Sequence, residues 1–175
     1  MSHRSILSSL FAGLAFFWLL SCTPQAPEQD QAHLSAYEVR ERMIEQNRAV
    51  LEAERQAILA FIDSSGMQFQ GTGTGMFVAK MEAEAGSAID TAQRVQVRSR
   101  ITGLHGEVYA DKLDQSISVL RDNDAIWGLQ EALIQSKVGD SLVCVIPAHL
   151  AHGLAGDLAE IPPLTTLVYY LRILQ

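Results

Sequence analysis

The segment VGDSLVCVIPAHLAHGLAGDLAEIPPLTTLVYYLRIL, residues 138–174, decides the fold of this chain. Its two apolar runs, SLVCVIP (141–147) and TTLVYYLRIL (165–174), are rich in β-branched and aromatic residues and are bounded by turn residues. Both runs therefore predict strands. The loop between them holds His149 and His152 together with two glycines and a double proline. A metal site, a catalytic histidine or the wall of a pocket could each use such a loop.

Upstream segments extend this pattern to a sheet with a single helix across it. RVQVRSRITG (94–103) alternates between apolar and polar residues, as a half-buried strand does, and GMFVAKME (75–82) and QSISVL (115–120) are further strand candidates. DAIWGLQEALIQSKVGD (124–140) instead has its apolar residues at helical spacing. We therefore predict one α+β domain, an antiparallel sheet wrapped on one short helix.

Residues 34–66 predict a separate helical segment ahead of the sheet. Ser35 and Glu38 have the spacing of a capping box, and apolar residues recur along one stripe at intervals of seven and four. Gly66 provides a natural end to the helix. The pattern leaves open whether this helix packs on its own domain or pairs with another chain.

The first residues have the features of a bacterial export signal. An apolar run of secretory length, ILSSLFAGLAFFWLL (6–20), is followed by LLSC, which resembles a lipobox that would place lipid on Cys22. An uncleaved membrane anchor is the alternative, although the run is short for a bilayer crossing. We expect a signal peptide at 1–21 and a polar tether at 22–33. The expected location is the cell envelope, as an exported lipoprotein on the outer membrane or facing the periplasm.

Charge and cysteine content exclude several other classes of protein. The chain has 13 basic and 20 acidic residues and no basic stripe, which argues against a nucleic-acid partner. If Cys22 carries lipid, Cys144 is left as a single thiol and no internal disulfide can form. Because Cys144 lies in an apolar strand, we expect it to be buried and inert.

The order of motifs in the C-terminal half resembles the FKBP-type peptidyl-prolyl cis-trans isomerases. The markers are Gly128-Leu129, Gly139-Asp140, Ile146-Pro147, Leu150-Ala151-His152-Gly153, Ile161-Pro162-Pro163 and Thr166-Leu167-Val168-Tyr169. The resemblance covers residues 67–175, which it implies form an FKBP-like domain. With the helix and the lipobox, the whole chain looks most like FKBP-type lipoproteins of Bacteroidetes, including the gliding-motility branch.

This resemblance implies an apolar cleft that turns Xaa-Pro bonds without a covalent intermediate. Leu129 would form the floor, and the backbone N–H of Ile126 would bind a substrate carbonyl. His152 stands where the family has a tyrosine that donates to the ligand, and its ring N–H could replace that donor. The walls would come from Tyr109, Ile161 and Tyr169.

Several positions depart from the family pattern. Ser99 stands where the second strand is expected to offer an aromatic residue. Ser116 and Ser118 stand where bulky aromatics are usual, unless the register differs by one, and Asp111 comes one residue later than the usual acidic position. Fewer aromatics predict a wider and wetter pocket with weaker catalysis.

Two functions are consistent with these features. The first is a membrane-anchored peptidyl-prolyl isomerase that acts on Xaa-Pro segments of exported proteins and assists their folding. The alternative is a catalytically weak or inactive FKBP-like module that binds or chaperones chains in the cell envelope. A metal site built from His149, His152 and His105 is the rival use of the loop, but these residues do not complete a tetrahedral ligand set. We therefore expect no metal and no cofactor.

Overall fold

The computed structural model describes residues 35–82, 85–121 and 125–174, so the predicted signal peptide, Cys22 and the tether lie outside the described residues. Its elements are α2 (Ala36–Ser65), β1 (Gln70–Gly71), β2 (Phe77–Glu82), β3 (Arg94–Thr102), β4 (Val108–Ser118), α3 (Trp127–Ile134), β5 (Ser141–Ile146), the 3₁₀ helix η1 (Ala148–Leu150) and β6 (Leu167–Ile173). Within these described ranges, no helix has both the length and the apolar composition needed to cross a membrane.

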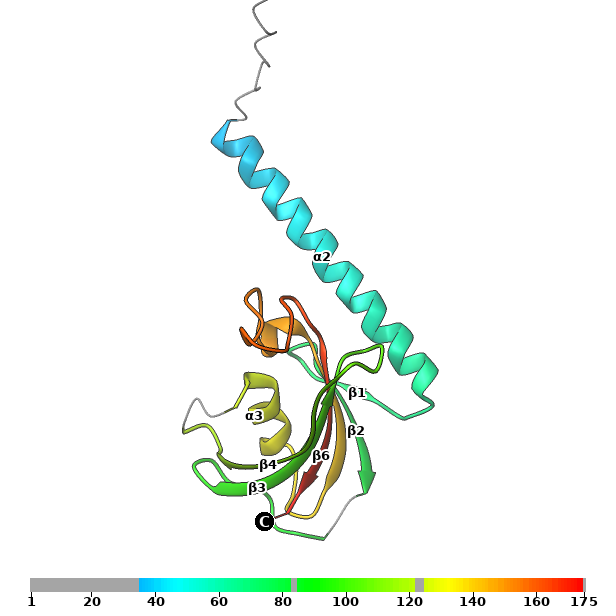
Figure 1. Cartoon of the computed structure of the whole chain (residues 1–175), viewed down its shortest axis with the longest axis vertical. Coiled ribbons are helices and arrows are strands. Elements are labelled where there is room, and N and C mark those ends of the chain that lie inside the picture. The colour runs from blue at the N-terminus through cyan, green and yellow to red at the C-terminus, as the bar shows by residue number, and fades with distance from the viewer. Residues whose placement is uncertain (1–34, 83–84, 122–124, 175) are drawn as a thin grey trace, which may run out of the picture. The chain divides into compact units, whose positions relative to one another are not determined.

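The six strands form one antiparallel sheet in the order β1-β2-β5-β6-β3-β4, and the short helix α3 lies against one face of it (Figure 1). The predicted α+β fold, with a helical segment ahead of the sheet, is confirmed. The two strands predicted on either side of the histidine loop, β5 and β6, are direct neighbours in the centre of the sheet. The loop therefore begins and ends at the same end of two adjacent strands.

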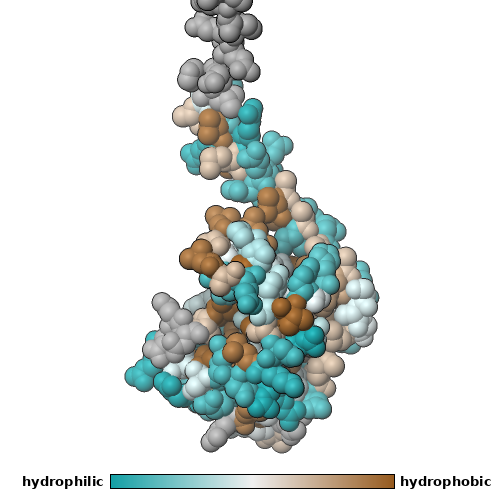
Figure 2. Space-filling model, viewed as in Figure 1, coloured by the Kyte–Doolittle hydropathy of each residue, from teal (hydrophilic) through white to brown (hydrophobic). Residues whose placement is uncertain are grey.

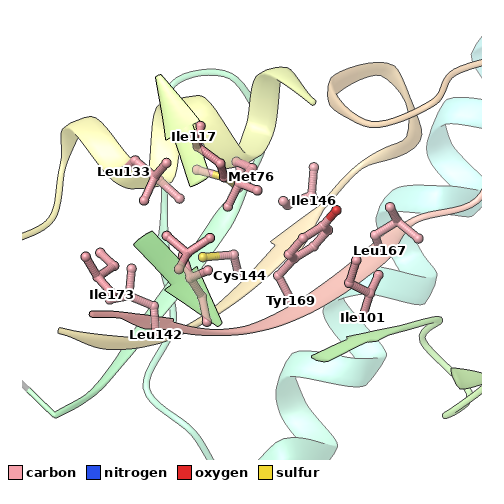
Figure 3. Close-up of a cluster of buried hydrophobic side chains, with 14 of the residues drawn as sticks. Met76, Ile101, Ile117, Leu133, Leu142, Cys144, Ile146, Leu167, Tyr169 and Ile173 are labelled. Atoms are coloured by element: carbon pink, nitrogen blue, oxygen red, sulfur yellow. The ribbon is translucent and has the colours of Figure 1, made fainter. Parts of the chain in front are cut away.

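Strand β5 is apolar from Leu142 to Ile146 because both of its faces are covered there. Leu142, Cys144 and Ile146 point into the larger core under α3 (Figure 3), whereas Val143 and Val145 point into a second cluster on the opposite face. A strand buried on both faces has no position for a polar residue. This explains why the sequence shows a continuous apolar run there instead of alternation.

The C-terminal part of α2 supplies the second cluster. Ile58 is 3% exposed and packs with Val143, Val145 and Val168, and Phe61 and Ile62 lie against the same group. The question left open by the sequence is answered for this part of the helix, which packs on its own sheet. At the other end the predicted capping box is confirmed: Ser35 N–H donates to the Glu38 carboxylate over 2.8 Å, and Glu38 N–H donates to Ser35 Oγ over 3.2 Å.

Helix α3 approaches the sheet closely at Gly128. A Cβ atom at this position would lie less than 3.0 Å from the side chain of Ile146 on β5. Only glycine therefore permits this packing distance. The close contact places the first turn of α3, with Leu129 and the preceding Ile126, directly over the sheet.

Cys144 is expected to resist alkylation in the native state. It is fully buried, and burial raises the pKa of its thiol to about 12, so the reactive thiolate is scarce at ordinary pH. We expect no iodoacetamide adduct on Cys144 at pH 8 in the folded protein and complete modification in denaturant, as measured by peptide mass spectrometry. Rapid native labelling would contradict the packed, inert role.

Candidate active site

A cavity of about 470 Å³ opens between the first turn of α3, the sheet and the loop that joins β5 to β6. It is lined by Ile101 of β3, Leu113 and Gln115 of β4, Ala125 and Ile126 ahead of α3, Leu129 of α3, His152 and Ile161 of the loop, and Tyr169 of β6. Six of these nine side chains are aliphatic, and Gln115, His152 and Tyr169 carry the polar groups. Such a cavity removes water from a ligand while leaving a few polar groups to orient it.

The structure brings five of the six predicted site residues to this cavity: Ile126, Leu129, His152, Ile161 and Tyr169. Leu129 is 1% exposed and Tyr169 is 5% exposed, so both are held firmly by the core beneath them. His152 and Ile161 come from the loop, as the sequence interpretation required. All five therefore lie at one cavity, and their roles as floor and walls stay predictions.

Tyr109 does not line this cavity. It is half-buried on β4 and lines a separate hollow of about 400 Å³ next to α2. The reason is a bulge in β4: Ser99 pairs with Leu113 and Ile101 with Ala110, so two residues of β4 lie opposite one residue of β3. A second register shift, between the pairs Ile101–Ala110 and Thr102–Val108, leaves Tyr109 as an extra residue of the strand. Tyr109 still packs against the larger core, and its role as a wall stays a prediction.

The side chains that β3 and β4 offer to the cavity differ from those expected. Ile101, and not Ser99, lines it from β3, and Leu113 and Gln115 line it from β4. Ser99 is instead fully buried in the sheet, and its hydroxyl has no hydrogen-bond partner within the described residues. Because the lining residues of β4 have odd numbers, Ser116 and Ser118 are not the positions to compare with the aromatics of the family.

Sequence reasoning missed these lining residues because it could not locate the bulge. Lys112 has a positive φ of 55°, a conformation that is uncommon for a residue with a side chain and that a single sequence does not reveal. On β3 a signal was present: the alternation that buries Val95 and Val97 continues to Ile101. The alternation passes through Ser99 and places Ile101 on the same inward face, next to the cavity.

Besides the side chains of Gln115 and His152, two further polar groups lie at the cavity. Burial raises the pKa of Tyr169 to about 12, so its hydroxyl remains protonated, and no hydrogen bond to another described residue uses it. The Ile126 N–H precedes α3, and the described part of the chain offers it no acceptor, while the Ile126 carbonyl accepts from Leu129 N and Gln130 N. Both groups are of the kind that donates to a carbonyl oxygen of a bound peptide.

Asp157 shapes the loop that carries Ile161. Its carboxylate accepts hydrogen bonds from the backbone N–H groups of Ala159, over 2.9 Å, and of Ile161, over 2.7 Å. These two bonds, with a smaller contribution from the charge of His152, hold the pKa of Asp157 below its usual range. The carboxylate thus keeps the Ile161 wall in place while it is ionised.

The Ile161 wall is expected to loosen in acid. Because the pKa of Asp157 is lower in the folded than in the unfolded chain, its contribution to stability is complete above the unfolded value of about 4 and is lost as the pH falls through the folded value. The amide resonance of Ile161, followed by NMR against pH, should titrate in that acid range. Asp157→Asn should abolish this titration, and an unchanged titration would contradict the role of the carboxylate.

The other histidines of the rival metal site lie apart from His152. A ring nitrogen of His149 lies 3.2 Å from the Thr74 carbonyl oxygen, and His105 lines the hollow next to α2. Among the described residues, no three histidine, cysteine or acidic side chains are grouped in a way that could hold a metal ion. Of the two histidines in the loop, His152 lines the cavity and His149 does not.

Comparison with known proteins agrees with this arrangement of cavity and loop. Residues 86–174 match the FKBP-type peptidyl-prolyl cis-trans isomerase family. The chain belongs to this family. The match includes α3, the histidine loop and both central strands, so the cavity described above lies in the isomerase domain. Sequence comparison with curated proteins finds no match.

Solved structures support the FKBP fold. A peptidyl-prolyl cis-trans isomerase from Pseudomonas syringae pv. tomato aligns with a TM-score of 0.61 and 23% identity over 73% of this chain and 93% of that chain. FkpA from Escherichia coli aligns with a TM-score of 0.62 and 22% identity over 97% of this chain and 81% of that chain. At these identities the likeness establishes the fold, and the isomerase assignment rests on the family match.

Proposed function

We propose that this FKBP-type isomerase is anchored to a membrane by lipid and assists the folding of exported proteins. The isomerase part of the proposal rests on one observation, the gathering of Ile126, Leu129, His152, Ile161 and Tyr169 around a single apolar cavity. The anchoring and export parts rest on the sequence around Cys22. The Bacteroidetes lipoprotein branch, including its gliding-motility members, is the relationship that we propose for the whole chain.

An apolar cavity is sufficient for this reaction because no bond is made or broken. Rotation about a peptide bond crosses a barrier of about 18–20 kcal/mol, and the planar amide is more charge-separated than the twisted one. Removal of water therefore raises the energy of the planar form more than that of the twisted form. The rate increases when the cavity also binds the twisted form more tightly.

The polar groups of the cavity have the complementary task of holding the peptide. The Ile126 N–H can bind a carbonyl next to the proline, and the Tyr169 hydroxyl can donate to a second acceptor. Ile101, Leu129 and Ile161 surround the space for the prolyl ring. These hydrogen bonds hold the peptide on one side of the Xaa-Pro bond while the prolyl ring on the other side turns. Binding that is stronger in the twisted state lowers the barrier to rotation.

Isomerase activity is tested with a protease-coupled assay on short Xaa-Pro peptides. Micromolar protein should accelerate cis/trans exchange above the uncatalysed rate. The absence of any acceleration would reject the isomerase part of the proposal. Boiled protein and a peptide without proline serve as controls for protease contamination.

Lipid attachment is tested separately in cells. Metabolic labelling with a clickable palmitate analogue should label the full-length protein, and Cys22→Ser should abolish both the label and the membrane fractionation. Cys144→Ser is the matched control, because Cys144 is buried and is not available for lipid. Label that persists in Cys22→Ser would reject the proposed anchor.

His152→Tyr is expected to increase isomerase activity. A tyrosine reaches further into the cavity than histidine and supplies a hydroxyl donor that carries no charge near neutral pH. We expect kcat/KM to rise by about threefold to tenfold, since one added hydrogen bond in a partly buried site is worth about 1 kcal/mol. An activity equal to or below the wild type would contradict the role of position 152 as a ligand donor.

A chain-binding function is the second candidate, because apolar side chains are exposed near the cavity. Leu154 is 80% exposed, Leu158 is 89% exposed and Trp127, next to Ile126, is 59% exposed. Hydrophobic surface is visible over the loop region in Figure 2. Suppression of aggregation of a refolding client that lacks cis-prolines would support this function, and loss of suppression in a Leu154→Ser, Leu158→Ser variant would locate it.

A further inference from the structure

We propose that Glu54 of α2 is a positioning residue for the isomerase site. Its carboxylate closes a ring of hydrogen bonds around the cavity loop, residues 148–166. Helix α2 would then help to set the position of the loop that lines the cavity. The activity readout of this proposal rests on the proposed isomerase function.

One oxygen of Glu54 binds both ends of the loop. Its Oε1 accepts a hydrogen bond from Ala148 N–H over 2.7 Å and another from the Thr166 hydroxyl over 2.6 Å. Ala148 is 3% exposed and Thr166 is 6% exposed, so neither donor can readily turn to water. Buried donors need an acceptor, and an ionised carboxylate makes shorter and stronger bonds than a neutral one.

The ring continues through the backbone of the loop itself. The Ala148 carbonyl accepts from Gly153 N–H over 2.8 Å, and the Gly153 carbonyl accepts from Leu164 N–H over 2.9 Å. Thr166 follows two residues after Leu164 and returns to Glu54. His152 immediately precedes Gly153. The hydrogen bond from Gly153 N–H to the Ala148 carbonyl therefore restrains the backbone next to His152, which lines the cavity.

Glu54 is held in position by the packing of its own helix. Ile58, Phe61 and Ile62 follow it at intervals that repeat on one helical face, and all three lie in the cluster against the sheet. The Glu54 carboxylate therefore lies on the same face of α2 that packs against the sheet. A domain that lacked α2 would leave the Ala148 N–H and the Thr166 hydroxyl without this acceptor, and nothing would then hold the two ends of the loop to one carboxylate.

The test compares Glu54→Ala with Glu45→Ala in the full chain. Glu45 is an exposed residue of the same helix with no hydrogen bond or ion pair to another described residue, so its substitution controls for helix propensity and charge. Glu54→Ala should lower kcat/KM by about tenfold, the scale expected when a site wall is misplaced. Amide hydrogen exchange at Gly153 and Leu164 should become faster in the same variant.

Two further variants keep the proposal open to refutation if Glu54→Ala folds poorly. Glu54→Gln retains an acceptor and should recover part of the activity, whereas Thr166→Val removes one donor at nearly constant volume. The effects of Glu54→Ala and Thr166→Val should be less than additive, since both break the same bond.

Exchange and activity distinguish this proposal from the proposed function. Exchange at Gly153 and Leu164 that is equal in the Glu54 and Glu45 variants would overturn the ring, whatever the activity. If the wild-type protein shows no isomerase activity, the proposed function fails, and the exchange measurement alone still decides whether Glu54 holds the loop.

Discussion

Leu129→Asn is expected to lower kcat/KM by on the order of a hundredfold, because the mechanism depends on a dry cavity floor. Leu129 is 1% exposed and lies between the cavity and the core under α3. Asparagine has a similar size, but its carboxamide would bring water or an unpaired dipole to the place where the prolyl ring binds. Hydration of the planar imide would then be restored and the barrier would rise.

The same substitution costs stability, so folding has to be measured beside activity. Burying an amide without partners costs about 1–3 kcal/mol in proteins, to which the lost apolar contact is added. Urea unfolding shows whether the variant is folded under assay conditions. Leu129→Met is the matched control: it conserves volume and polarity, and its activity should remain within about threefold of the wild type. Equal activities of the two variants would contradict desolvation as the source of catalysis.

Gly156→Ala is expected to displace the Ile161 wall and to lower kcat/KM by about tenfold or more. Gly156 has a φ of 67°, in the left-handed region that favours glycine. A Cβ atom there would also lie less than 3.0 Å from the carbonyl oxygen of Ile161 and from the backbone of Pro162. The backbone of the wall has to move, because no flexible side chain can absorb the clash.

Gly153→Ala separates the clash from the backbone conformation. Gly153 has a similar φ of 62°, but a Cβ atom at this position would meet no atom within 4 Å. Both variants carry the left-handed strain, and only Gly156→Ala carries the clash. The activity loss in Gly156→Ala should therefore be clearly the larger of the two. Equal losses would show that strain alone, and not the position of Ile161, limits the activity.

Much of the fold was predictable because its signals are local. The capping box at Ser35 and Glu38 and the apolar runs of β5 and β6 each follow from a few adjacent residues. The site residues on α3, on the histidine loop and on β6 were identified by short motifs whose order along the chain resembles that of the family. Leu129 and Tyr169 lie in regular elements, whereas His152 and Ile161 lie in a loop of turns whose motifs, and not its periodicity, carried the prediction.

The outer part of the site could not be predicted in the same way. Leu113 and Gln115 line the cavity from β4, whereas Ser116 and Ser118 pair with Gln96 and Arg94, and register shifts on either side of Ala110 set the positions of the residues around it. A shift of one residue moves every side chain to the other face of a sheet. Because the bulge is stabilised by pairing with β3, nothing in the residues of β4 alone indicates it.

By itself, then, the sequence determined the class of fold, and it predicted the residues of α3, the loop and β6 that line the cavity and the lipid at Cys22. The tertiary structure decided the register of β4 and the attachment of α2. Glu54 meets Ala148 and Thr166 across 94 and 112 residues of chain. Such a contact exists only after the strands have paired and the helix has packed on the sheet. No pattern of neighbouring residues could therefore have revealed it.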